Sequence, residues 1–511
     1  MAAADNPTVS GLYVLLPARG LRAARPVESR FLTRFAGIRS TRPPATLAIA
    51  DFLAPIATEP GRLAPAFPEP VHVIDSVHEN GPKLVSMSDS AAGAFAAADS
   101  GLRLVPVRYY RPAQALDRAP ASPAAGAGAH PPLTLTVVGG PSPSPIANVK
   151  VVAYVSLAGD EGAAGVTDAA GQVSLALGGS PVTLDSLYIA PPERDHWGFY
   201  RTTHTVQNGD VIALASIAAP YDDCLRRACA PGLPTDGAGV RVAVIDTGVG
   251  PHPDLTVGGG ANAVQGEARG DYEDNGVGHG THVAGIIAGH AAAGAPLGAA
   301  PAASLWSGRV FGAGGGDATN YSIMKAMILA TEDDCDLLNL SLAANDVDTV
   351  LQDAIADAID QGAVVFAAAG NDGRQGLAYP ARCAGAVAVT AYGESGAYPA
   401  DTPHDAEAGS PQAPPEFFAN FSNWGAGVGF VGPGVGVIST AVGGGYAVRS
   451  GTSMACAATT GRAARLLAGA PALLAQVRDH ARSVAIQNLL QANVRAMPPA
   501  FGFSYAGSGR L

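Results

Sequence analysis

The chain has 511 residues, too many for one core of ordinary size, so we expect about two to four domains. Its formal net charge of -12 argues against nucleic acid as a partner, because phosphate binding requires a basic surface. No apolar run approaches the roughly 18 residues that a membrane span requires, and the N-terminus carries no clear secretory signal. These features exclude no compartment; the cytoplasm is the default expectation, with export left open.

Residues 1–111 are expected to form a small α+β segment. His72 to Ile74 and Lys83 to Met87 are typical of strands, and Asp89 to Ala98 is typical of a short helix. Leu102 to Tyr110 predicts another strand. Such a unit is either a docking domain or, where an active site follows in the chain, an intramolecular inhibitor.

Residues 112–132 are almost entirely Pro, Ala, Gly and Ser, a composition that predicts a partly extended linker. Alternating β-branched runs then predict a small β-sandwich over residues 133–215. Pro145 to Val149 and Thr167 to Gln172 resemble the transthyretin-like regulatory domain that is attached to carboxypeptidases and many surface enzymes. The sandwich holds no catalytic or metal-spaced cluster, so we expect it to pack or to bind a partner.

Residues 220–495 have the pattern of an α/β domain. Val240 to Ile245 is a continuous apolar run that ends in Asp246, as a parallel strand buried on both faces requires. Further apolar runs alternate with helical stretches, which predicts a doubly wound, mainly parallel sheet with functional groups at the carboxyl ends of its strands. Residues 496–511 are expected to be a C-terminal tail.

Three short motifs in this region carry chemistry, in the order Asp, His, Ser. Asp246 lies in Ile-Asp-Thr-Gly, His279 in Gly-His-Gly-Thr-His, and Ser453 in Gly-Thr-Ser-Met-Ala. Helix formers follow Ser453, so its hydroxyl should lie in the first turn of a helix. The free N–H groups and the dipole there favour the negative charge that develops when a hydroxyl attacks a carbonyl.

With Asn371 in Ala-Ala-Gly-Asn, the region from about 235 to 495 resembles the subtilisin-like serine proteases. The resemblance implies a serine endopeptidase in which Asp246 orients the imidazole and His279 is the general base. Ser453 would be the nucleophile, and Asn371 would stabilise the oxyanion together with the Ser453 N–H. Taken one at a time, Asp246 and Asn371 also suit structural turns.

The resemblance also implies the substrate-binding residues. Ser341, Leu342 and Ala343 would form the edge strand to which an extended polypeptide adds, and Ala369 and Gly370 the opposite wall of the S1 pocket. These walls favour a small or apolar P1 residue.

Three positions depart from the family pattern. Ala343 replaces the usual glycine, which predicts a narrower pocket, and Ala457 replaces the usual proline, which leaves transpeptidation as a minor alternative to hydrolysis. Cys383-Ala384 replaces the family's Tyr-Pro step near the pocket, which affects the expected turn there and not the triad.

No cofactor is needed for this chemistry. Two acidic runs could hold structural calcium, as family members often do, or lie in solvated loops. They comprise Asp271, Glu273 and Asp274, and Glu332, Asp333, Asp334 and Asp336. His282 suggests zinc only weakly, and we expect it to be a core histidine.

The alternative to an enzyme is a catalytically silent scaffold that uses residues 1–215 to hold a partner.

Overall fold

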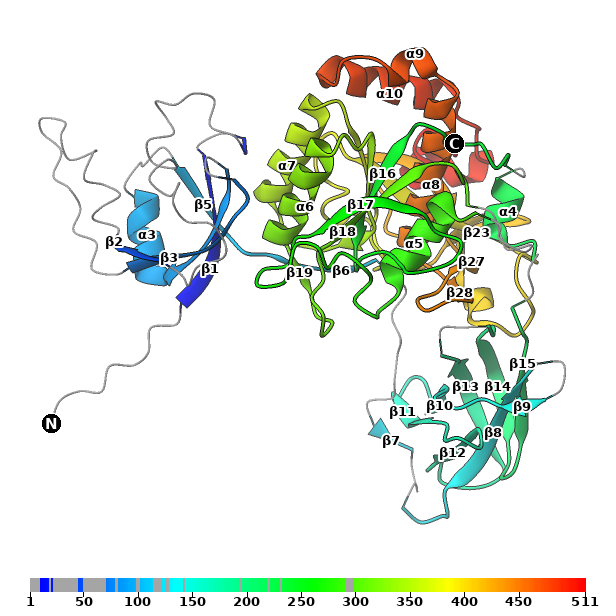
Figure 1. Cartoon of the computed structure of the whole chain (residues 1–511). Coiled ribbons are helices and arrows are strands. Elements are labelled where there is room, and N and C mark those ends of the chain that lie inside the picture. Colours follow the sequence, from blue (N-terminus) through cyan, green and yellow to red (C-terminus); the bar gives the residue numbers. More distant parts are fainter. Residues whose placement is uncertain are drawn as a thin grey trace, which may run out of the picture.

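The computed structural model describes residues 10–17, 20–21, 45–48, 70–78, 81–97, 102–113, 122–124, 128–140, 143–192, 195–217, 221–229, 232–290 and 298–511. An N-terminal sheet and a two-sheet unit flank a large central α/β body (Figure 1). Parts of the predicted 112–132 linker, 114–121 and 125–127, lie outside the described residues.

The N-terminal sheet has the strand order β2-β3-β4-β1-β5 and is antiparallel throughout. Its elements are β1 (Ser10–Pro17), β2 (Ala45–Ala48), β3 (Pro70–Ser76), β4 (Lys83–Ser88), α3 (Asp89–Ala97) and β5 (Leu102–Pro106). The predicted strand 102–110 is two strands in the structure, because the chain leaves this sheet after β5 and begins β6 (Tyr109–Pro112) in another.

The two faces of this sheet are both apolar. Leu15 and Val85 pack with Phe95 of α3 in one core, whereas Val14 and Leu16 belong to a core of the central body. This follows from the period of two along a strand, which sends successive side chains to opposite faces. Lys325 Nζ also lies 2.6 Å from Asp75 Oδ2. The N-terminal sheet is therefore docked on the central body.

The two-sheet unit follows. One sheet has the order β14-β13-β10-β11-β7 and the other β12-β8-β15, with β9 beside β8. The strands are β7 (Ser122–Pro123), β8 (Leu133–Gly139), β9 (Ser144–Pro145), β10 (Lys150–Ser156), β11 (Glu161–Val166), β12 (Gln172–Leu175), β13 (Val182–Ala190), β14 (Phe199–Val206) and β15 (Val211–Leu214). Buried residues of both sheets, among them Leu135, Val151 and Leu187, form one cluster between them.

The two-sheet unit also contacts the central body through specific groups. Arg201 forms an ion pair with Asp401 at 2.5 Å. Trp197 is 1% exposed, belongs to the core of the central body, and meets the His404 ring edge-on at 5.7 Å. The unit is therefore anchored by a buried aromatic residue as well as by surface charge.

The central body is built on a sheet of order β17-β18-β16-β20-β22-β23-β25-β24, with β26 also beside β23. Its strands are β16 (Arg241–Asp246), β17 (Val257–Asn262), β18 (Ser304–Arg309), β20 (Leu337–Leu340), β22 (Val364–Ala368), β23 (Val387–Glu394), β24 (Ala408–Ala413), β25 (Glu416–Ala419) and β26 (Val428–Pro433). The neighbouring strands β17, β18, β16, β20, β22, β23 and β26 pair in parallel, whereas β25 pairs antiparallel with both β23 and β24. The predicted mainly parallel α/β sheet is confirmed.

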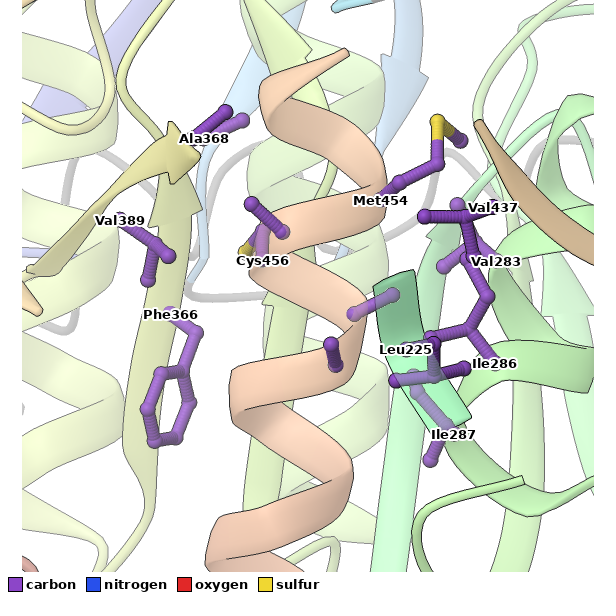
Figure 2. Close-up of a cluster of buried hydrophobic side chains, with 14 of the residues drawn as sticks. Leu225, Val283, Ile286, Ile287, Phe366, Ala368, Val389, Val437, Met454 and Cys456 are labelled. Atoms are coloured by element: carbon purple, nitrogen blue, oxygen red, sulfur yellow. The ribbon is translucent and has the colours of Figure 1, made fainter. Parts of the chain in front are cut away.

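Helices cover both faces of this sheet. Along β16, Val242 and Val244 belong to the core that contains α5 (His279–Ala288) and α8 (Thr452–Ala468), whereas Ala243 and Ile245 face the core of α6 (Asn320–Glu332) and α7 (Thr349–Asp360). Figure 2 shows α8 between the sheet residues Phe366 and Val389 and the α5 residues Val283 and Ile286. Helix α8 is thus fixed at the centre of the body.

Smaller elements complete the body. They are α4 (Cys224–Ala228), β19 (Ala318–Thr319), β21 (Leu342–Ala343), η3 (Pro403–Glu407), β27 (Val437–Thr440), β28 (Tyr446–Arg449), α9 (Pro471–Leu474), α10 (His480–Ala492), η4 (Pro499–Phe501) and α11 (Gly502–Ala506). The residues expected as a tail are packed instead: Phe501 and Leu511 are buried in the core, and Arg510 pairs with Glu416. No helix in the described part of the chain has the length and apolar character to span a bilayer.

Candidate active site

Asp246 and His279 meet at the carboxyl end of β16. Asp246 is the last residue of that strand and His279 the first of α5. The His279 Nδ1 lies 2.8 and 2.9 Å from the two Asp246 carboxylate oxygens, and both side chains are fully buried. A carboxylate on Nδ1 fixes the tautomer and orientation of the ring and leaves Nε2 for proton transfer. The fold thus brings Asp246 and His279 into the contact that was expected of them.

Asp274 shapes the loop that delivers His279, a role that sequence reasoning did not assign to it. Its Oδ1 accepts the N–H groups of Gly276 and Gly278 at 3.0 and 2.8 Å, and its Oδ2 accepts the Thr281 hydroxyl at 2.8 Å. These bonds join the loop before α5 to the first turn of the helix. The signal available in the sequence was an acidic residue five positions before the histidine.

Close packing beneath α5 requires a glycine after the histidine. A Cβ on Gly280 would lie 2.2 Å from the Gly248 carbonyl oxygen and 3.0 Å from the Asp246 Cβ. Gly280 therefore lets the helix start approach the strand that carries Asp246, which the 2.8 Å contact to His279 needs.

Ser453 is the second residue of α8 and is fully buried. Its Oγ lies 2.6 Å from the Ala113 carbonyl oxygen and 3.0 Å from that of Ser341, and its N–H also donates to the Ala113 oxygen at 3.2 Å. The His279 Nε2 is buried and has no hydrogen-bond partner among the described residues. The structure therefore does not form the expected Ser453–His279 hydrogen bond, because the hydroxyl is directed to the two carbonyls.

Asn371 lies next to the start of α8. Its Oδ1 accepts the N–H and the hydroxyl of Thr452 at 2.9 and 2.8 Å. With the oxygen held in this way, the Nδ2 is buried without a hydrogen-bond partner in the described part of the chain. An unpaired buried donor beside the Ser453 N–H is chemically suited to a developing oxyanion.

A segment from outside the central body occupies this site. Strand β6 runs antiparallel between β19 and β21, with Tyr110 opposite Ala318 and Pro112 opposite Leu342. Ala113 follows, and its N–H donates to the Ser341 oxygen at 3.0 Å while its carbonyl meets Ser453. Pro112 and Ala113, expected to begin a linker, are thus held in the site, because main-chain pairing needs no particular side chains.

The predicted substrate-binding residues divide into two groups. Ser341, Leu342 and Ala343 contact the inserted segment through their backbones. Ala369 and Gly370 lie beside Asn371, and the Gly370 N–H donates to the Thr452 hydroxyl at 3.3 Å. The role of these two residues as a pocket wall stays a prediction.

Three of the residues considered for metal binding, Asp336, Asp274 and His282, are engaged in contacts within the protein. Asp336 accepts hydrogen bonds from Arg478 and Arg482, and Asp274 from the loop described above. Among the described residues no group of three or more His, Cys, Asp or Glu side chains is placed to hold a metal ion. His282 is a buried core histidine, and its Nε2 lies 3.2 Å from the Ala447 carbonyl oxygen. Its burial lowers the pKa of the imidazole well below the usual value.

Comparison with known proteins identifies the family to which this region is similar. The model of the subtilase family, Peptidase S8, matches residues 237–503. Subtilisin BL of Lederbergia lenta is 38% identical over 250 residues, which cover 49% of this chain and 84% of that protein. Subtilisin E of Bacillus subtilis strain 168 is 37% identical over 255 residues, covering 49% of this chain and 61% of that protein. An alkaline protease of Shouchella clausii is 38% identical over 250 residues, covering 49% and 60%.

Proposed function

We propose, on the premise that the chain belongs to the subtilase family and is a subtilisin-like serine endopeptidase, that it cleaves extended polypeptide segments after a small residue. The observation that carries the proposal is the inserted strand β6, which pairs with β21 and is followed by Ala113, whose carbonyl oxygen accepts the Ser453 hydroxyl. Pairing through the main chain selects for an extended backbone rather than for a particular sequence, so unfolded polypeptide is the substrate class.

In the proposed mechanism Ser453 Oγ attacks the substrate carbonyl carbon while His279 Nε2 takes its proton. The leaving amine receives that proton, and water then hydrolyses the acyl-enzyme by the same route in reverse. Asp246, bonded to Nδ1, stabilises the imidazolium that forms. Rotation of the hydroxyl from the Ser341 oxygen towards His279 would complete the hydrogen-bonded triad, which is commonly loose before the reacting complex forms.

The Ser453 N–H and the Asn371 Nδ2 are proposed to stabilise the oxyanion. The N–H already donates to the Ala113 oxygen at 3.2 Å, and the Nδ2 is the unpaired donor beside it. Donors held in place before the reaction require no reorganisation as charge develops on the oxygen.

Residues 1–113 are proposed to be the first substrate and then an inhibitor of the enzyme. The Ala113 carbonyl has the position of the reacting group, so the bond between Ala113 and Gln114 would be the one cleaved. The N-terminal sheet, docked on the body through Asp75 and Lys325, would then hold β6 in the site after cleavage. The alanine at this position also supports the preference for a small P1 residue.

Residues 133–215 are proposed to form a transthyretin-like β-sandwich that stays with the central body after cleavage. The buried Trp197 and the Arg201–Asp401 ion pair support a lasting attachment.

A fluorophosphonate probe and an assay on unfolded casein test the proposed activity. The wild-type chain should be labelled at Ser453 and should degrade casein, whereas Ser453→Ala and His279→Ala should do neither. Equal casein degradation by wild type and Ser453→Ala would refute the assignment of Ser453, and no degradation or labelling of wild type would favour the silent-scaffold alternative.

A further inference from the structure

Tyr110 is the most deeply buried side chain of the inserted strand. It precedes Ala113 by three residues, so it occupies the P4 position, the fourth before the proposed cleavage. Tyr110 is 0% exposed, whereas its neighbour Tyr109 is 54% exposed. Its ring belongs to the same buried cluster as Leu342 and Leu351. The site therefore encloses one side chain of the bound segment.

The hydroxyl of this tyrosine meets a buried carboxylate. Tyr110 Oη donates to Asp348 Oδ2 at 2.9 Å, and Asp348 is 1% exposed. Burial raises the pKa of the Asp348 carboxyl, and burial next to Asp348 raises that of the Tyr110 hydroxyl. A hydrogen bond between a hydroxyl and a carboxylate is strong where water is excluded.

The two carboxylate oxygens of Asp348 accept hydrogen bonds from different partners. Asp348 is the N-cap of α7, and its Oδ1 accepts the N–H groups of Val350 and Leu351 at 2.9 and 3.2 Å. The helix thus fixes the carboxylate and, through its dipole, favours its negative charge. Oδ2 remains directed at the ligand side chain, held in place by a rigid element of the enzyme.

We propose that Asp348 is a specificity-determining residue that selects substrates with tyrosine at P4 over those with phenylalanine. The inference rests on the proposed function, since P4 is defined by cleavage after the residue bound at Ser453. A site built to accept a hydrogen bond from a substrate hydroxyl rejects the analogue that lacks it, because a buried polar group loses its donor. Sequence reasoning missed this residue, since a lone Asp before a helix indicates only a cap.

Two matched peptides test the inference on enzyme that has cleaved itself and has been purified away from residues 1–113. Both carry a fluorophore and a quencher, and their P4 to P1 residues are Tyr-Arg-Pro-Ala or Phe-Arg-Pro-Ala. We expect wild type to prefer the tyrosine peptide by about tenfold or more in kcat/KM. In Asp348→Ser, which keeps a good N-cap but removes Oδ2, the ratio of kcat/KM for the tyrosine peptide to kcat/KM for the phenylalanine peptide should fall to within about twofold.

Substrate analogues on wild type provide a second measurement that needs no variant. A peptide with O-methyltyrosine at P4 has no hydroxyl donor and should be cleaved no faster than the phenylalanine peptide, whereas 4-aminophenylalanine should be cleaved faster than phenylalanine. Equal rates for tyrosine and phenylalanine in wild type, or an unchanged preference in Asp348→Ser, would overturn the inference. No cleavage of any peptide by wild type would instead remove the proposed function, and the inference with it.

Discussion

Replacing Gly280 by alanine tests whether close contact between α5 and β16 is needed for activity. The new Cβ would lie 2.2 Å from the Gly248 carbonyl oxygen, about 1 Å inside an ordinary carbon–oxygen contact. The helix start that carries His279 must therefore move by about 1 Å from the strand that carries Asp246. Since a displacement of 1 Å in a catalytic group can reduce the rate by about 100-fold, we expect a loss of that order in kcat/KM.

The control is Gly314→Ala, because a Cβ at Gly314 meets nothing within 4 Å. Both variants would be assayed on the same peptide, with thermal unfolding measured in parallel. Alanine has the higher helix propensity, so a general effect of Gly→Ala in α5 would stabilise the helix rather than damage the site. Activity of Gly280→Ala within threefold of Gly314→Ala would refute the reasoning.

Three further outcomes follow from the geometry. Asn371→Ala should reduce kcat by about 100- to 1000-fold, the loss known for the oxyanion asparagine of subtilisin, with KM little changed; a change mainly in KM would contradict the oxyanion role. Burial lowers the pKa of His404 to about 4, so the unfolded chain binds this proton below about pH 6.5 and the folded chain only near pH 4. Stability should therefore fall by about 3 kcal/mol as the pH drops from 6.5 to 4, and His404→Gln should show a smaller fall in chemical denaturation; equal slopes would contradict the assignment. Trp197→Ala should destabilise the protein by about 3–5 kcal/mol, whereas Val211→Ala, at a site 62% exposed, should leave thermal unfolding unchanged.

The strands and the site motifs could be predicted because their signals are local. The apolar run that ends in Asp246 requires a buried parallel strand, and the glycines around His279 mark a turn into a helix. The meeting of Asp246 with His279 followed from the resemblance to a family, because residues 33 positions apart in sequence carry no sign of contact on their own.

The occupant of the site could not be predicted from the sequence. Pro112 and Ala113 have the composition of a linker, and their pairing with Ser341 and Leu342 uses only backbone groups. The role of Asp348 was hidden for a related reason, since its cap contacts are local whereas its partner Tyr110 lies 238 residues away. Contacts between residues far apart in the chain produce no local sequence pattern from which they could be predicted.

Determination of the N-terminus and intact mass of the purified chain tests the central claim most directly. The account predicts that wild type is cut between Ala113 and Gln114 and that Ser453→Ala, prepared in the same way, keeps this bond intact. A wild-type chain cut at another bond, or a Ser453→Ala chain cut at this one, would contradict the proposal that the inserted strand is the enzyme's first substrate.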